Sequence, residues 1–169
     1  ELAFQQLVFT GVGFIFFLLL SQFDIHALAK FIKPLYLLII LLLIIVAILG
    51  VETRGAIRWI PLGFFNIQPS EFAKPVLILT LASFWTKNTA NWKSIFKSLG
   101  IISPFILLIF KQPDLGSSLA LIAIWLGILF ASRVSVKKII ILLLIAVLTV
   151  PSGWLFLREY QRQRITGFF

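Results

Sequence analysis

The sequence is poor in charge and almost lacks the side chains that build metal centres. It has no cysteine, which excludes disulfides and thiolate metal sites, and its single histidine, His26, cannot form a histidine-rich metal site. It also has no methionine, at its first position or elsewhere. We therefore expect the 169 residues to be part of a longer chain.

Charged side chains make up only 12% of the chain, whereas about a quarter of a soluble domain is charged. Hydrophobic residues make up 60%, and the mean hydropathy is +1.08. A chain of this composition cannot cover an apolar core with polar side chains, so we predict an integral membrane protein. The net charge of +9 does not indicate nucleic-acid binding, because the basic residues lie at the ends of apolar runs, as they do at membrane interfaces.

Six apolar segments predict an all-α, polytopic transmembrane protein with about six spans in a single domain, residues 1–169. Helices are favoured over membrane strands because the runs are continuous rather than alternating. The fourth segment contains Pro104 and is short for a span, so we expect its helix to begin earlier, within "NWKSIFK"; a re-entrant or kinked segment is the alternative. The segments are Leu2–Ser21, Pro34–Val51, Phe72–Thr86, Ser98–Phe110, Ser117–Ala131 and Ile139–Leu157.

The distribution of charge favours an extracytoplasmic position for the loop between the second and third segments. The numbers of basic residues on the two sides are nearly equal and do not decide the orientation. The loops at 22–33, 87–97 and 132–138 are plainly basic, which is typical of cytoplasmic anchors. On the other side the basic residues are mixed with acidic residues, glycine, proline and glutamine, which is more typical of a site.

Two similar motifs precede the third and fifth segments: "QPSE" at 68–71 and "QPDLG" at 112–116. Ser70 and Asp114 are expected to be N-caps, each preceded by a proline that directs the chain into the helix. Both helices begin on the same membrane face by alternation, and two helix N-termini together favour a phosphate group. The alternative is that both motifs only cap membrane helices. Gln68 and Gln112 open the two motifs and belong to the same candidate site.

The loop between the second and third segments supplies further candidate site residues. Arg54 and Arg58 offer the fixed fork of donors that matches phosphate, and Trp59 can cover a lipid chain. Glu71 and Lys74 are three residues apart and therefore neighbours on a helix. The alternatives are an ordinary aromatic belt with snorkelling arginines and an ordinary ion pair at a helix end.

The sequence contains no nucleophile triad, phosphate-binding loop or metal motif. The carboxylates of the site loops are Glu52, Glu71 and Asp114, and pairing with Arg54, Lys74 and Lys111 is the plain interpretation of them. We assign no metal site, although carboxylates together with a diphosphate could recruit Mg²⁺. The closing "REYQRQRITGFF" is interpreted from its spacing as a basic amphipathic exit from the membrane.

Three stretches in order, "GAIRWIPLGFFNIQPSEFAK", "QPDLGSSL" and "YQRQRI", resemble the SEDS family (shape, elongation, division and sporulation) of bacterial cell-wall proteins. "YQRQRI" favours members that act in elongation (RodA) over those that act in division (FtsW). The resemblance implies a polytopic protein of the bacterial inner membrane, of which this sequence is the N-terminal and central portion, without the first span and the C-terminal spans. Members polymerise lipid II, an undecaprenyl diphosphate-linked disaccharide-pentapeptide, together with a class B penicillin-binding protein and other membrane proteins of the elongation complex.

The resemblance also implies which residues line or brace the substrate cavity. Arg58 and Trp59 match the family's "RW", and Gln112 and Asp114 match its "QPD". The family's catalytic aspartate has no match in this sequence, so we assign no catalytic residue and expect the segment alone to be inactive. The positions that match "QPSE..K" are Gln68, Ser70, Glu71 and Lys74.

Two other functions fit the sequence. A transporter that flips lipid II would also hold charges within the membrane. A scaffold that positions the penicillin-binding protein would need only apolar helix faces, and would tolerate substitutions at Glu71 and Lys74.

Overall fold

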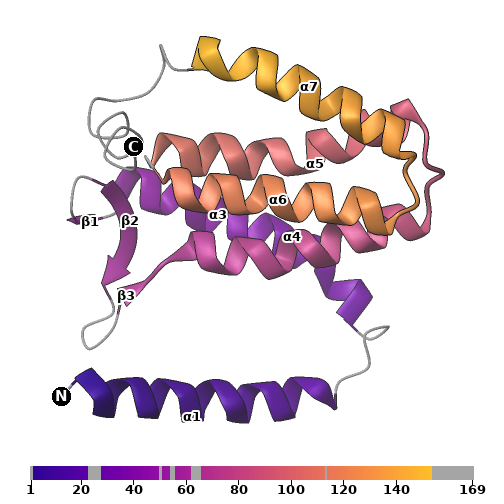
Figure 1. Ribbon diagram of the computed structural model, residues 1–169. Coiled ribbons are helices and arrows are strands. Elements are labelled where there is room, and N and C mark those ends of the chain that lie inside the picture. The colour runs from indigo at the N-terminus through magenta and orange to yellow at the C-terminus, as the bar shows by residue number, and fades with distance from the viewer. Residues whose placement is uncertain are drawn as a thin grey trace. The chain divides into compact units, whose positions relative to one another are not determined.

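The computed structural model of the protein describes residues 2–22, 28–49, 51–53, 56–61, 66–112 and 114–153. The chain divides into two units, Glu1–Ile32 and Lys33–Phe169. Helix α1 (Leu2–Ser21) and a short 3₁₀ helix, η1 (Ala29–Phe31), belong to the first unit. The second unit holds the remaining helices and strands and all of the candidate site (Figure 1).

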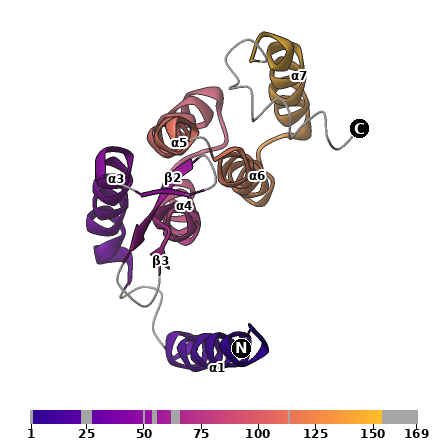
Figure 2. The same cartoon turned by 90° about the vertical axis from the view of Figure 1, so that its left-hand side faces the viewer.

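The second unit is a bundle of apolar helices. Figure 2 shows α4, α5 and α6 together, with α3 beside α4 and α5, and α7 outermost against α6; α4, α5 and α6 contact one another. The helices are α3 (Ile32–Leu49), α4 (Pro69–Thr86), α5 (Trp92–Lys111), α6 (Leu115–Ala131) and α7 (Val136–Gly153). The predicted helical membrane fold is therefore confirmed.

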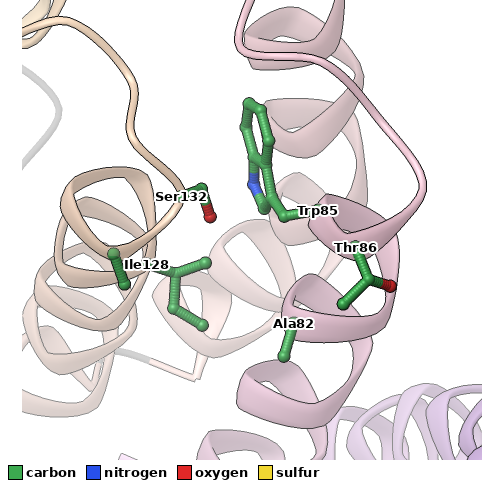
Figure 3. A pocket seen from close by; sticks show the side chains of 6 residues that line it. Ala82, Trp85, Thr86, Ile128 and Ser132 are labelled. Atoms are coloured by element: carbon green, nitrogen blue, oxygen red, sulfur yellow. The ribbon is translucent and has the colours of Figure 1, made fainter.

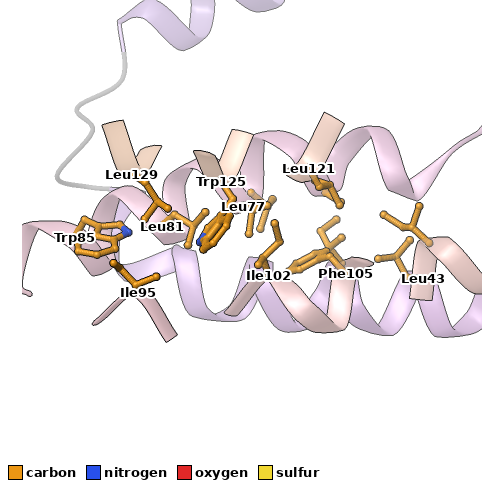
Figure 4. Close-up of a cluster of buried hydrophobic side chains, with 14 of the residues drawn as sticks. Leu43, Leu77, Leu81, Trp85, Ile95, Ile102, Phe105, Leu121, Trp125 and Leu129 are labelled. Carbon is orange, nitrogen blue, oxygen red and sulfur yellow. The ribbon is translucent and has the colours of Figure 1, made fainter. Parts of the chain in front are cut away.

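The core of the bundle consists of one face from each of its central helices (Figure 4). Leu77 and Leu81 are fully buried and lie four residues apart on α4, so they share one face of that helix. Ile102 and Phe105, which are three residues apart and fully buried, likewise share one face of α5. The opposite faces are also apolar but exposed, which suits contact with lipid.

Among the described residues, two helical stretches are long and apolar enough to cross a membrane, Ala29–Ile48 and Trp92–Lys111. The apolar helices Gln6–Ser21 and Leu115–Ala131 are shorter. The fourth predicted segment does extend back, because α5 begins at Trp92, where the Asn91 side chain accepts from the backbone N–H of Ser94 at 2.8 Å. The helix continues through Pro104, so it is one continuous helix and not re-entrant.

Several predicted helix ends are shifted. The first segment has the predicted bounds, whereas the second ends at Leu49 because Val51 belongs to a strand. The third begins three residues early, at Pro69, and the fifth two residues early, at Leu115. The sixth begins three residues early, at Val136, and residues 154–157 of that prediction lie outside the described residues.

A small antiparallel sheet replaces the irregular loop expected between the second and third segments. Its strands are β1 (Val51–Thr53), β2 (Ala56–Pro61) and β3 (Asn66–Ile67), in the order β1-β2-β3. Val51 pairs with Trp59, and Ile60 pairs with Ile67. The β-branched and aromatic residues of "AIRWIP" were the sequence signal for β2. The sheet lies between the end of α3 and the start of α4, and β2 contacts α4 (Figure 1).

Candidate functional site

The two "QP" motifs meet in the structure. Gln68, just before α4, donates through Nε2 to Asp114 Oδ2 at 2.9 Å, and Asp114 lies just before α6. The first turns of the two helices are therefore neighbours, as the alternation of spans predicted. We call this group of Gln68, Ser70, Asp114 and Ser117 the Gln68–Asp114 junction.

Asp114 is the N-cap of α6, which confirms the prediction. Its Oδ1 accepts from the backbone N–H of Ser117 at 3.2 Å, and its Oδ2 accepts from the Ser117 hydroxyl at 2.9 Å. The residue is only 5% exposed, so these bonds replace the water that the carboxylate would otherwise bind. Ser118 adds a bond within α6 by donating to the Asp114 carbonyl oxygen at 2.9 Å.

Ser70 is not the N-cap of α4, so that prediction was wrong. The N-cap is Gln68, and the helix begins at Pro69. Proline suits the first helical position because its fixed φ is helical and its missing N–H would have no partner there. Ser70 is therefore inside the first turn, where its buried hydroxyl accepts from Gln68 Nε2 at 2.9 Å. The Gln68 side chain thus joins the helices and does not cap α4.

Gln112 braces the bundle. It is 2% exposed, and its Nε2 donates to the carbonyl oxygen of Leu43, within α3, at 2.8 Å. This bond ties the end of α5 to α3, just before the chain reaches Asp114. Of the two roles the family resemblance offered for Gln112, lining or bracing, the structure supports bracing.

Glu71, on the first turn of α4, forms the expected ion pair with Lys74 on the second turn. Lys74 Nζ lies 2.7 Å from Glu71 Oε1, and the two side chains are 28% and 54% exposed, respectively. A carboxylate is favourable at a helix N-terminus. Because both side chains reach solvent, the pair can contribute little to stability and is accessible to a ligand.

The "RW" pair lies on β2, the strand that contacts α4. Trp59 is half-buried and pairs across the sheet with Val51, next to an irregularity in the register of β1 and β2. Arg58 precedes it on the same strand. The candidate Arg54 and the "YQRQRI" stretch lie outside the described residues.

Comparisons with known proteins identify the family. The sequence model of the FtsW, RodA and SpoVE family, described as "Cell cycle protein", matches residues 1–169. The chain belongs to the FtsW/RodA/SpoVE family. The resemblance drawn from the three sequence stretches is thereby confirmed.

The similar proteins include both family branches. A "Probable peptidoglycan glycosyltransferase FtsW" of Wigglesworthia glossinidia brevipalpis is 34% identical over 97% of this chain and 44% of its own length. "Peptidoglycan glycosyltransferase MrdB" of Escherichia coli K12 is 32% identical over 92% of this chain and 43% of its own length. The chain thus spans less than half the length of these relatives.

Two solved structures share the fold. One, described as "Structural coordination of polymerization and crosslinking by a peptidoglycan synthase complex", matches with a TM-score of 0.81 and 31% identity over 96% of this chain and 49% of that chain. The crystal structure of Thermus thermophilus rod shape determining protein RodA matches with a TM-score of 0.73 and 27% identity over 86% of this chain and 49% of that chain.

The structure adds residues to the site that the sequence analysis of this FtsW/RodA/SpoVE member did not single out. Ser117 and Ser118 follow Asp114 at the third and fourth positions, where hydroxyl groups can reach a capping residue. That spacing was visible in "QPDLGSSL". Among the described residues no group of three or more acidic or histidine side chains could hold a metal ion, and the Mg²⁺ expectation stays a prediction.

Proposed function

We propose that the whole protein is a peptidoglycan glycosyltransferase that polymerises lipid II into glycan strands during cell elongation. The FtsW and MrdB relatives are named peptidoglycan glycosyltransferases, which supports the reaction class. The preference for elongation rests on "YQRQRI", since the chain is about equally similar to FtsW and MrdB relatives. The protein would lie in the bacterial inner membrane with the Gln68–Asp114 junction on its extracytoplasmic side.

One observation of the structure carries the proposal: the junction places the N-termini of α4 and α6 side by side. Each N-terminus carries a partial positive charge, which at α6 is partly offset by the capping Asp114 carboxylate, and the pair suits the diphosphate of a lipid-linked sugar. Lys74 lies on the second turn of α4, and Arg58 lies on the strand that contacts α4. Cations and helix ends are thus grouped on one end of an apolar bundle.

In this reaction the hydroxyl of one sugar attacks the anomeric carbon of another, and the bond to undecaprenyl diphosphate breaks. Negative charge grows on the leaving diphosphate, so positive groups fixed beside it stabilise the transition state. A general base takes the proton of the attacking hydroxyl, and we assign that role to no residue of this sequence. Mg²⁺ could share the diphosphate with the protein.

The proposed partner is a class B penicillin-binding protein that crosslinks the new strands, within the membrane proteins of the elongation complex. The solved structure described as coordinating polymerization and crosslinking in a peptidoglycan synthase complex supports such a partner.

Arg58→Ala in the full-length protein is expected to lower the rate of lipid II polymerisation about 100-fold, because it removes a cation from the leaving group. The measurement is glycan-strand synthesis from lipid II by the purified protein with its penicillin-binding partner. Lys97→Ala, which removes an exposed cation of α5, is the control and should polymerise normally. An Arg58→Ala variant as fast as the Lys97→Ala control would remove Arg58 from the mechanism. Headgroup translocation without any polymer from the parent would favour a transporter.

Substitutions at Glu71 and Lys74 test whether the ion pair contributes to stability or to polymerisation. Lys74→Ala should change the free energy of unfolding by less than about 1 kcal/mol, because the ion pair is partly exposed. The double variant Glu71→Lys/Lys74→Glu keeps opposite charges three residues apart but moves the cation by nearly a turn. We expect the double variant to unfold close to the melting temperature of the parent. It should polymerise lipid II at least tenfold more slowly, which corresponds to the loss of about one charge-assisted hydrogen bond. Normal growth of cells that depend on the double variant would instead favour the scaffold function.

A further inference from the structure

An open cavity lies at the far end of α4 and α6, away from the Gln68–Asp114 junction. It occupies about 290 Å³, roughly the volume of ten water molecules, which is large enough for part of a lipid. Figure 3 shows side chains from the last turns of the two helices around it. The lining residues are Ala82, Trp85, Thr86, Ile128, Ala131 and Ser132.

The cavity contains a hydrogen-bond donor without a protein acceptor. Trp85 is 7% exposed, and its indole N–H has no partner among the described residues. Figure 3 shows the nitrogen edge of the ring turned towards Ser132, which also lines the cavity. Buried indole N–H groups normally find an acceptor. Trp125 does so in the same core, where it donates to the Ser98 hydroxyl at 2.9 Å. The Trp85 donor therefore points to a ligand that brings its own acceptor.

Two basic residues directly follow lining residues of the cavity in the chain. Lys87 follows Thr86 as the C-cap of α4, and Arg133 follows Ser132, the C-cap of α6. Both cations are exposed. Cations at helix C-termini are favourable by themselves. Here they also follow directly on Thr86 and Ser132, which line an apolar cavity, at the end of helices that lie in a membrane, where anionic headgroups are found.

We propose that this cavity binds an anionic glycerophospholipid of the surrounding bilayer. The indole N–H of Trp85 donates to an ester carbonyl oxygen of the lipid, and the first part of an acyl chain lies between Ala82 and Ile128. The phosphate lies near Lys87 and Arg133. The binding does not depend on polymerisation, since the cavity and the junction are at opposite ends of α4.

The test follows the indole N–H resonance of Trp85 in full-length, ¹⁵N-tryptophan-labelled protein. The protein is titrated in detergent with phosphatidylglycerol or with phosphatidylcholine, and Trp85→Phe identifies the resonance by its loss. We expect phosphatidylglycerol to shift this resonance until it saturates, as a new hydrogen bond forms. Native mass spectrometry of the same samples should show Trp85→Phe binding phosphatidylglycerol about fivefold more weakly, the effect of one lost hydrogen bond.

Further variants test separately the indole N–H donor, the volume of the cavity and the two basic residues. Ala82→Phe fills the cavity and should abolish the tight site even if Trp85→Phe folds poorly. Lys87→Gln and Arg133→Asn should each lower phosphatidylglycerol affinity about fivefold, which corresponds to roughly the electrostatic attraction of one basic residue. Asparagine is chosen at position 133 because it tolerates the left-handed backbone there, at φ 57°. Trp125→Phe removes an indole N–H that is already bonded, so it should leave lipid affinity unchanged.

Three results would overturn the proposal. The first is a Trp85 resonance that phosphatidylglycerol does not move, as would occur if another segment of the protein fills the cavity. The second is unchanged phosphatidylglycerol affinity in both Trp85→Phe and Ala82→Phe. The third is phosphatidylcholine binding as tightly as phosphatidylglycerol, since Lys87 and Arg133 would then have no part in recognition.

Discussion

Asp114→Ala will lower the free energy of unfolding of the full-length protein by about 3 kcal/mol. The carboxylate caps α6 through the Ser117 N–H and accepts from the Ser117 hydroxyl and Gln68 Nε2. The loss of an N-cap costs about 1 kcal/mol, and each buried donor left without an acceptor costs a further 1–3 kcal/mol or so. The measurement is thermal unfolding in one detergent, with polymerisation assayed on the same preparations.

Two companion variants test whether the bond between the helices is responsible. Asp114→Asn keeps an oxygen for the cap but can place an NH₂ group opposite the NH₂ of Gln68. Adding Gln68→Glu restores an acceptor opposite that donor, so the double variant should regain stability over Asp114→Asn alone. Ser118→Ala is the control, because its lost bond to the Asp114 carbonyl lies within α6. If Asp114→Ala melts at the temperature of Ser118→Ala, the junction does not hold the helices together.

The contact between the two "QP" motifs shows what sequence reasoning could reach. Gln68 and Asp114 are 46 residues apart in the sequence, yet span alternation placed both motifs on one membrane face, and the two residues are bonded there. The N-cap of α4 was harder to predict. A proline can either precede the N-cap or occupy the first helical position, and Pro69 occupies the first helical position. Capping depends on which backbone N–H groups lack partners, and a motif alone does not reveal that.

The helices themselves were predictable because a bilayer requires continuous apolar runs. Leu2–Ser21 was predicted with its final bounds, whereas the sheet of β1, β2 and β3 was missed. Its strands are only two to six residues long, too short for a clear alternating pattern beside charged and glycine residues. Nor does the sequence tell whether Arg58 or Lys74 contacts a diphosphate, because that depends on the ligand as well as on the protein.

The packing of the helices could not be read from hydropathy, because the lipid-facing and core-facing sides are both apolar. Two of the phenylalanines of helix α5, Phe96 and Phe105, lie on different sides. Phe96 is 60% exposed, whereas Phe105 is fully buried. The burial of the two residues therefore depends on how the helices pack, which composition does not record.

Phe105→Ala will therefore destabilise the full-length protein by about 3–5 kcal/mol, while Phe96→Ala on the same helix changes its stability by less than about 1 kcal/mol. The rings of Phe105 and Tyr36 pack in a T-shaped arrangement with 5.0 Å between their centroids, and the Tyr36 hydroxyl donates to the Ile101 carbonyl at 2.9 Å. Truncation removes packing contacts that link α3 to α5 and leaves a cavity that lipid cannot reach.

The measurement is unfolding of both variants in mixed micelles with increasing denaturing detergent. Phe105→Leu, which keeps most of the apolar volume, should fall between the parent and Phe105→Ala. Equal loss of stability in Phe96→Ala and Phe105→Ala would mean that removal from lipid, and not packing between α3 and α5, sets the energy. Transfer of a side chain from lipid to a protein core gains little hydrophobic free energy, so we expect packing to dominate the stability. The difference between Phe96→Ala and Phe105→Ala measures the contribution of packing within one helix.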